Sequence, residues 1–365
     1  MNIEGKNVAQ EVLGYWNVKN ASNRDADNGY SKWTMLSGVA RVMYNYADRY
    51  MLTGTFRADG SSRFTNKKWG YFPSVAGAWT VSNEKFWEPI RNAVEYMKIR
   101  ASWGIIGNQN ITPYSTLASL NATSFNYGTN TNYTGYWAGG IATPDLTWEK
   151  VKQLDFGIDL GFLGNRLSVG IDYFSKKTTD ALLQQSSTGY LGGVTYWTNA
   201  GEVSNKGFDI NVNAQIIQTK DLQWSSSLNA SYLKNEVTKL SAQTPRLYGE
   251  KPALGTVDPC TIIQEGEAIG TFYGFKWAGL QKNDKGQWVD TYYKSNGTIT
   301  TDPDASTDRF ILGHSNPDFT FGWNNTVTYK NWDFNMFCNA AFGAKRLNIV
   351  RYVMNAEVGA SMFVT

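Results

Sequence analysis

The side chains that most often carry catalysis or metal binding are scarce in this chain of 365 residues. His314 is the only histidine, so sites built from several histidines are excluded and a nucleophilic triad would have a single candidate base. It lies in the segment Leu312-Gly-His-Ser-Asn-Pro317, which predicts a water-exposed loop ahead of a strand. Carboxylate pairs among the 31 acids have no discernible apolar pocket around them. We therefore predict that the protein is not an enzyme.

The remaining candidates for metal or cofactor binding have incomplete motifs. Asp302, Asp304 and Asp308 resemble a sparse calcium ligand set, but the Gly and the terminal Glu of the twelve-residue calcium loop are missing, and an Asp-rich turn is the alternative. Cys260 and Cys338 are 78 positions apart, which indicates neither a zinc site nor a disulfide framework. A single disulfide bond between them is the alternative. No Gly-x-Gly-x-x-Gly or Walker motif occurs. We expect no metal and no cofactor.

Clusters of Tyr and Trp in long polar segments are the candidates for ligand contact. Aromatic rings offer flat apolar faces that stack on sugars or peptide side chains, while their polar edges stay hydrated. Loops that pack on one another or on a partner protein would use the same residues, so this alternative stays open. The candidate substrate-binding residues are Tyr133, Tyr136, Trp137, Tyr190, Tyr196, Trp197, Trp288, Tyr292 and Tyr293.

Strands must position these clusters, because apolar and polar residues alternate along much of the chain. Leu154–Phe162 is apolar at every second position, and Leu167–Tyr173 repeats the pattern beyond the short turn Leu163-Gly164-Asn165. Since successive side chains of a strand point to opposite faces, these segments predict a hairpin with one apolar face. The same pattern predicts strands at residues 34–46, 50–57, 71–82, 96–106, 147–162, 166–177, 203–216, 223–235, 319–329 and 332–342.

Two architectures use such strands. A soluble sandwich buries the apolar face under a second sheet, whereas an outer-membrane barrel turns it to lipid and lines its lumen with polar residues. The Gly, Ser, Asp and Asn on the second face favour a wet lumen, and 15% aromatic against 18% charged residues suits a barrel with aromatic interfaces. No segment approaches the roughly 20 apolar residues of a membrane helix. The net charge of +3 is too small to indicate nucleic-acid binding.

The connections between the predicted strands alternate between compact and long, which is typical of an up-and-down barrel with periplasmic turns and external loops. One compact connection contains residues 84–93, predicted to form a short helix capped by Ser82 or Asn83. In the longest loop, residues 271–280 predict an additional hairpin. Aromatic residues near strand ends predict a girdle at the membrane interface: Tyr44, Tyr46, Tyr50, Trp79, Phe162, Tyr173, Tyr329 and Trp332.

Five motifs, in order over most of the chain, point to one family. They are Arg57-Ala-Asp-Gly-Ser-Ser-Arg-Phe64, Trp69-Gly-Tyr-Phe-Pro-Ser-Val-Ala-Gly-Ala-Trp79, Lys98-Ile-Arg-Ala-Ser-Trp-Gly-Ile-Ile-Gly-Asn-Gln109, Gly266-Glu-Ala-Ile-Gly-Thr-Phe-Tyr-Gly-Phe275 and Asn316-Pro-Asp-Phe-Thr-Phe-Gly322. In these residues the chain resembles SusC/RagA-type TonB-dependent outer-membrane transporters.

The resemblance implies an all-β, antiparallel, up-and-down transmembrane β-barrel, of which residues 1–365 supply a partial barrel domain of about ten strands out of about 22. No plug domain, TonB-contacting segment, signal peptide or terminal strand is recognisable, so we expect an internal fragment. Alone, it should form a curved open sheet, with a closed ten-stranded barrel as the alternative. The turn 163–165 should lie at the periplasmic rim, with Ile158 and Leu160 facing lipid and Asp155, Asp159 and Asp172 lining the lumen.

The resemblance also implies a function and partners. The full protein would lie in the outer membrane of a Gram-negative, Bacteroidetes-like cell and import glycans, oligosaccharides or peptides. Its partners would be a SusD-like surface lipoprotein, the TonB complex through a plug region, and outer-membrane lipid, with no nucleic acid. This segment alone should not perform energised transport. A secreted β-rich glycan-binding module and a passive porin are the alternatives.

Overall fold

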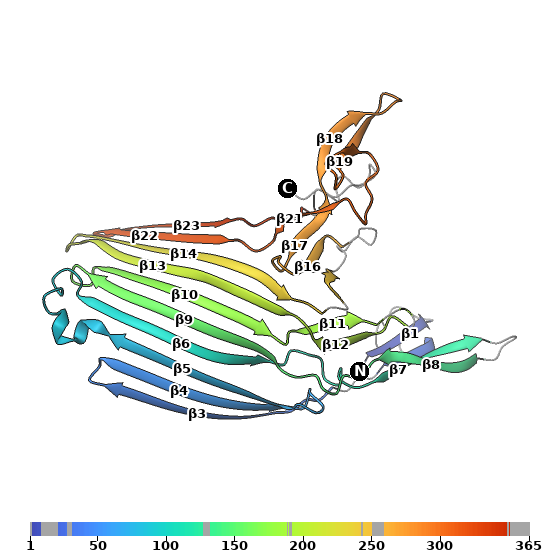
Figure 1. Ribbon diagram of the computed structural model, residues 1–365, viewed down its shortest axis with the longest axis horizontal. Coiled ribbons are helices and arrows are strands. Elements are labelled where there is room, and N and C mark those ends of the chain that lie inside the picture. Colours follow the sequence, from blue (N-terminus) through green and yellow to red (C-terminus); the bar gives the residue numbers. More distant parts are fainter. Residues whose placement is uncertain are drawn as a thin grey trace.

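The computed structural model describes residues 2–8, 21–27, 31–126, 132–187, 189, 192–241, 244–249, 259–348 and 350. Its main body is one antiparallel sheet in which neighbouring strands follow one another along the chain (Figure 1). The ten strands are β3 (Met35–Tyr46), β4 (Tyr50–Ser61), β5 (Trp69–Thr80), β6 (Tyr96–Asn108), β9 (Glu149–Phe162), β10 (Leu167–Thr179), β13 (Glu202–Gln218), β14 (Leu222–Lys239), β22 (Phe319–Tyr329) and β23 (Trp332–Phe342).

The sheet is open, since β3 and β23 form its two opposite edges (Figure 1). All ten predicted strands of the main sheet are confirmed, with bounds that differ by a few residues, and so is the up-and-down order. The alternative of a closed ten-stranded barrel is wrong, because β3 pairs only with β4 and β23 only with β22 within this sheet. Within the described ranges, no helix is both long and apolar enough to cross a membrane.

The strand register separates the side chains into two faces. One row across the sheet is apolar and defines the apolar face: Ile99, Ile158, Ile171, Ile210, Ala230, Phe321 and Ala340 are successive partners. The adjacent row defines the polar face: Arg100, Gly157, Asp172, Asp209, Ser231 and Thr320. Large side chains of the apolar face are exposed, including Val42 at 73% and Leu52 at 54%.

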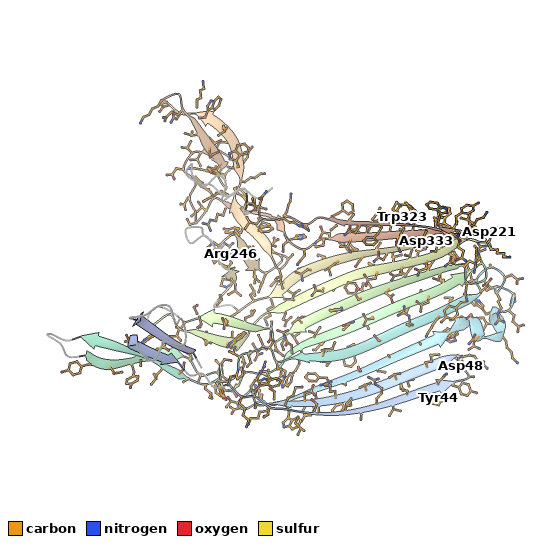
Figure 2. The ribbon with its side chains drawn as sticks, turned by 180° about the vertical axis from the view of Figure 1, so that it is seen from behind. Tyr44, Asp48, Asp221, Arg246, Trp323 and Asp333 are labelled. Atoms are coloured by element: carbon orange, nitrogen blue, oxygen red, sulfur yellow. The ribbon has the colours of Figure 1, made fainter. Side chains whose placement is uncertain are left out.

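Tight turns gather at one end of the sheet, called the turn end, and longer connections at the other, called the loop end. Asp48, Asp221 and Asp333 lie at the turn end, while Arg246 lies toward the loop end (Figure 2). The turn between β9 and β10 places Leu163, Gly164 and Asn165 in the left-handed region, with φ of 57°, 69° and 59°. Their exposed amides are bound from outside the turn: Glu95 accepts hydrogen bonds from the backbone N–H of Gly164 and Asn165. This contact fixes the turn against the β5–β6 connection.

The short helix predicted over residues 84–93 is confirmed only as a single 3-10 turn, Lys85–Trp87, and the expected side-chain cap is absent from it. Glu84 is extended, and another 3-10 turn, Val81–Asn83, precedes it. Asn83 does not cap a helix, because its side-chain amide donates to the carbonyl of Asp48. The Glu84 carboxylate accepts bonds from Tyr50, Trp79 and Arg49 at 2.6, 3.3 and 3.2 Å. The Tyr50 bond contributes most to lowering the pKa of Glu84 below its usual range, and these tertiary contacts hold Glu84 away from helical geometry.

The loop end carries small sheets of its own. Three are two-stranded: β1 (Asn2–Val8) with β2 (Ala21–Asp27), β7 (Ser119–Asn126) with β8 (Asn132–Gly140), and β11 (Leu182–Ser186) with β12 (Thr195–Asn199). A four-stranded sheet joins β15 (Arg246–Tyr248), β16 (Thr261–Gln264), β17 (Thr271–Phe275) and β21 (Arg309–His314), and a three-stranded one joins β18 (Trp277–Lys282), β19 (Trp288–Tyr293) and β20 (Ile299–Thr300).

The hairpin predicted over residues 271–280 is wrong, although both of its strands exist. β17 pairs with β16 and β21, whereas β18 pairs with β19. Lys276 alone separates β17 from β18, and one residue cannot reverse the chain, since a hairpin needs a loop of at least about two residues. The chain therefore runs onward from one sheet into the next.

The buried core of the molecule lies at the loop end rather than inside the main sheet. Phe64, Phe72, Ile111, Leu146 and Trp148 form one buried cluster, called the mouth cluster, with Trp197 and Leu182 packed against it. Trp148 contacts two of its neighbours, with ring centroids 5.4 Å from both Phe64 and Phe72. Because its members come from four separate connections and strands, the cluster joins loops that are distant in sequence.

Several rings of the predicted aromatic girdle lie at the turn end, as expected. Tyr44, Tyr50, Tyr329 and Trp332 are exposed and lie within a few residues of the tight turns. Tyr173 departs from the prediction, because it lies in the middle of β10 with its ring 5.0 Å from that of Phe208. The interfacial function of the other rings stays a prediction.

Gly157 makes room for the ion pairs of the polar face, which leads to a first prediction. A Cβ at Gly157 would collide with Asp172 and approach Arg100 Nη2 to 2.9 Å, whereas at Gly170 it would meet only Asp159, at an ordinary 3.5 Å. We expect Gly157→Ala to leave the full-length protein about 1 kcal/mol less stable than Gly170→Ala, because Arg100 and Asp172 must move apart and lose a part-exposed ion pair, whereas Gly170→Ala gives no clash. Thermal unfolding in detergent measures both, and equal effects would contradict this account.

Candidate functional site

The polar face of the main sheet is centred on Arg100 of β6. Its guanidinium binds Asp159 of β9 through two hydrogen bonds of 2.7 and 2.9 Å, and its Nη2 lies 3.0 Å from Asp172 of β10. Arg100 and Asp172 are both register partners of Gly157, so the missing side chain lets them meet across β9. A cation shared between two acids offsets part of their mutual repulsion and links the three strands through their side chains.

Other acids of this face are hydrogen-bonded to neighbouring strands. Asp155 accepts a bond from Ser102 at 3.1 Å, and Asp209 one from Ser231 at 2.5 Å. These contacts belong to a wide hollow of about 1040 Å³ on the polar face. The charged residues that line the hollow are balanced in sign: Arg100, Lys176 and Arg346 against Asp155, Asp172 and Asp209. The expected placement of Asp155 and Asp172 on one face with Asp159 is confirmed.

The motif Arg57–Phe64 builds the edge of the mouth at the loop end. Arg57 Nε donates to both carboxylate oxygens of buried Asp59, at 2.9 and 2.7 Å. Arg63 donates to the carbonyl of Gln109 and lies over the ring of Trp33, 4.4 Å from its centroid. The last residue of the motif enters the mouth cluster. The motif is therefore organised by contacts within the protein.

The residues considered for catalysis or metal binding are held by ordinary structural contacts. His314 is not a loop residue as predicted but ends β21, half-buried, with Nδ1 2.7 Å from the carbonyl of Asn316. Asp308 is buried and accepts the backbone N–H groups of Ser295 and Asp304, which lower the pKa of its carboxyl. Among the described residues, no cluster of His, Cys, Asp or Glu is arranged to hold a metal ion. Cys260 and Cys338 are free thiols.

The predicted aromatic residues lie on three different hairpins. Tyr133, Tyr136 and Trp137 are exposed on β8, Tyr196 and Trp197 are half-buried on β12, and Tyr190 lies outside the described residues. Trp288, Tyr292 and Tyr293 lie on β19, where Trp288 is 64% exposed with Lys282 over its ring. Figure 1 shows β8 and β19 on opposite sides of the loop end. The structure therefore does not bring the three clusters into one pocket.

A polar inner face, an apolar outer face and loops gathered at one end are shared with a known group of proteins. Residues 6–349 match the family described as TonB dependent receptor-like, beta-barrel. The chain belongs to the TonB-dependent receptor family. This family comprises transporters rather than enzymes, and the resemblance predicted from the five motifs is confirmed.

Individual relatives of this TonB-dependent receptor segment agree. TonB-dependent receptor P3 of Formosa agariphila is 35% identical over 357 residues, covering 93% of this chain and 35% of that protein. TonB-dependent receptor SusC of Bacteroides thetaiotaomicron is 31% identical over 322 residues, covering 84% and 31%. The solved RagAB peptide transporter superposes with a TM-score of 0.76 at 25% identity, covering 91% and 36%. The chain thus spans about a third of the length of these relatives.

The sequence analysis did not identify two groups of residues that hold connections of the receptor segment in place. One is the mouth cluster, and the other is Glu84 with its three donors at the turn end. For the first, the sequence shows only that Gly70 and Gly107 are glycines; the structure gives the reason, because a Cβ at either position would collide with the ring of Phe72. No local pattern marks Glu84, since its donors lie on β4 and β5 and in the turn between β3 and β4.

A comparison of Trp197 with Trp288 tests which aromatic residues stabilise the fold and which are available to a ligand. Trp197 packs against the mouth cluster, whereas Trp288 is mostly exposed. We expect Trp197→Ala to lower the free energy of unfolding of the full-length receptor by about 2 kcal/mol, below the roughly 3–5 kcal/mol of a fully buried Trp. Trp288→Ala should change it by less than about 0.5 kcal/mol. Thermal unfolding in detergent compares them, and an equal loss in both variants would contradict the assignment.

Proposed function

We propose that residues 1–365 form part of the outer-membrane wall and the external mouth of a TonB-dependent nutrient transporter. The observation that carries this proposal is the division of one sheet into an apolar row and an adjacent row of hydrogen-bonding side chains. Lipid offers no hydrogen bonds, so a membrane-spanning sheet needs backbone pairing along every strand and an apolar outer surface. The other face of such a sheet must be polar if it lines an aqueous path.

Exposure of the apolar face supports contact with lipid. In a soluble domain, the row of Ile99, Ile158, Ile171 and Ile210 would need a covering layer, because large apolar patches are rarely left in water. The small sheets of the described residues lie at the loop end and do not cover this row (Figure 1). A secreted glycan-binding module would require a second sheet packed over this row, and the residues that the structure describes form none there.

Energy for transport would enter through other parts of the full-length receptor. The strands of this wall are hydrogen-bonded to both neighbours except at the two edges, so moving one would break a ladder of backbone bonds. We therefore assign gating to a plug region acted on by the TonB complex, outside the wall. Similarity to SusC and to the RagAB structure supports a SusD-like surface lipoprotein as the partner at the mouth.

The proposed substrates are oligosaccharides or peptides. The balanced charges of the hollow suit polar solutes without selecting strongly for net charge. Exposed Tyr136, Trp137 and Trp288 at the loop end offer ring faces on which sugars or peptide side chains stack. The RagAB protein is described as a peptide transporter, which supports peptides. A passive porin would use the same kind of wall but would need no TonB.

Two neighbouring residues of β13 test the membrane setting. Ile210 lies on the apolar face and Asn211 on the polar face, at the same depth in the sheet. We expect Ile210→Lys to destabilise the full-length receptor in a bilayer by about 2–4 kcal/mol, because a lipid-facing cation near the midplane is costly, and Asn211→Lys to cost far less. Folding into lipid vesicles, followed by the shift of the folded band on unheated gels, measures both. Equal tolerance of the two lysines would contradict the assigned faces.

Uptake experiments test the transport function itself. In the source bacterium, deletion of the full-length receptor should abolish growth on its substrate, supplied as an oligosaccharide or peptide mixture, and deletion of TonB should do the same. Re-expression of the full receptor should restore growth, whereas residues 1–365 exported alone should not, because we assign gating to a plug region outside this wall. Uptake that persists without TonB would instead identify a passive porin.

A further inference from the structure

The connection between β5 and β6, residues 81–95, is unlike the others at the turn end. The connections from β3 to β4, β9 to β10, β13 to β14 and β22 to β23 are tight turns, whereas this one contains two 3-10 turns and projects beyond the strand ends (Figure 1). Several contacts hold it in place. Glu84 binds Arg49, Tyr50 and Trp79, and Glu95 binds the 163–165 turn. It is called the β5–β6 connector below.

The position of Glu84 shows on which side of the sheet the connector lies. Tyr50 and Trp79 are register partners on the apolar face, and their rings stack with centroids 6.2 Å apart. Glu84 binds the polar atoms of both rings. The connector is therefore drawn toward the rim of the apolar face and not across the hollow of the polar face.

The connector extends that apolar rim beyond the strands. Phe86 packs edge-on against Trp79, with centroids 6.3 Å apart, yet its side chain is 59% exposed. Ile90 is 45% exposed and lies four residues further on, in a turn closed by the bonds from the N–H groups of Ile90 and Arg91 to the carbonyl of Trp87. Phe86 and Ile90 are thus the two large apolar side chains that the connector leaves exposed next to this rim.

Basic residues flank these two apolar side chains. Lys85 is exposed and has no acidic partner among the described residues, and Arg91 donates to the carbonyl of Ser82 while staying exposed. Of the connector's acids, Glu84 and Glu95 are engaged with protein groups, which leaves Glu88 as the exposed one. Exposed apolar side chains beside exposed cations suit the boundary between lipid tails and anionic headgroups.

We propose that the β5–β6 connector is a membrane-surface contact that inserts Phe86 and Ile90 into the periplasmic leaflet beside the barrel wall. Lys85 and Arg91 then lie at the level of the phosphates. The occupant is phospholipid because Phe86 continues, through Trp79 and Tyr50, the apolar face assigned to lipid. The inference rests on the proposed membrane setting of that face.

Spin-label depth measurements test this contact in the full-length receptor. Native cysteines, including Cys260 and Cys338, are replaced by serine, and the receptor is reconstituted into vesicles of phosphatidylethanolamine with phosphatidylglycerol. Labels are placed through Phe86→Cys and Ile90→Cys, with exposed Asn92→Cys as the control on the same connector. Collision with oxygen, which partitions into lipid, is compared with collision with a water-soluble nickel chelate.

We expect the labels at 86 and 90 to lie about 5–10 Å below the phosphates, favouring oxygen, and the label at 92 to stay accessible to nickel. Equal nickel access at 86 and 92 would overturn the proposal. So would low access to both reagents at 86, since that would mean burial against protein. A reference label through Ile171→Cys distinguishes the failures: if it too is water-accessible, the membrane setting fails, whereas a lipid-accessible label at 171 confines the failure to the connector.

Discussion

Pairing of backbone groups between strands is the constraint on which the rest of this structure depends. A strand in lipid has no water to satisfy its N–H and C=O groups, so each must bond to its neighbours. That pairing sets the register, and the register stacks four isoleucines in one row and Arg100, Gly157, Asp172 and Asp209 in the next. A shift of one residue in any strand would move its apolar side chains to the polar face.

The strand register also explains how the charged side chains of the polar face form ion pairs. Glycine at 157 leaves a gap over which Arg100 and Asp172 meet, and Asp159 completes the cluster from the same strand as the glycine. Ion pairs and hydrogen bonds between neighbouring strands join most of these charged side chains. The charged residues that line the hollow are balanced in sign.

The two ends of the sheet are organised by different interactions. At the loop end, burial of Phe64, Phe72 and Trp148 holds loops that are distant in sequence together. At the turn end, Glu84 gathers hydrogen bonds from two aromatic residues and an arginine, and so fixes the one long connection against the rim. The rigid parts of the mouth and rim thus owe their positions to contacts between residues distant in sequence.

Local pattern alone determined the ten main strands, their order and their two faces, because alternation with a period of two depends only on neighbouring residues and repeats in every strand. Five motifs determined the family. Tertiary structure decided three further features. Glu84 is extended and not helical, and His314 is the last residue of a strand. β17 and β18 belong to different sheets on either side of Lys276. Tertiary structure also placed Trp197 against the mouth cluster. Each outcome depends on partners far along the chain, which only folding brings into contact.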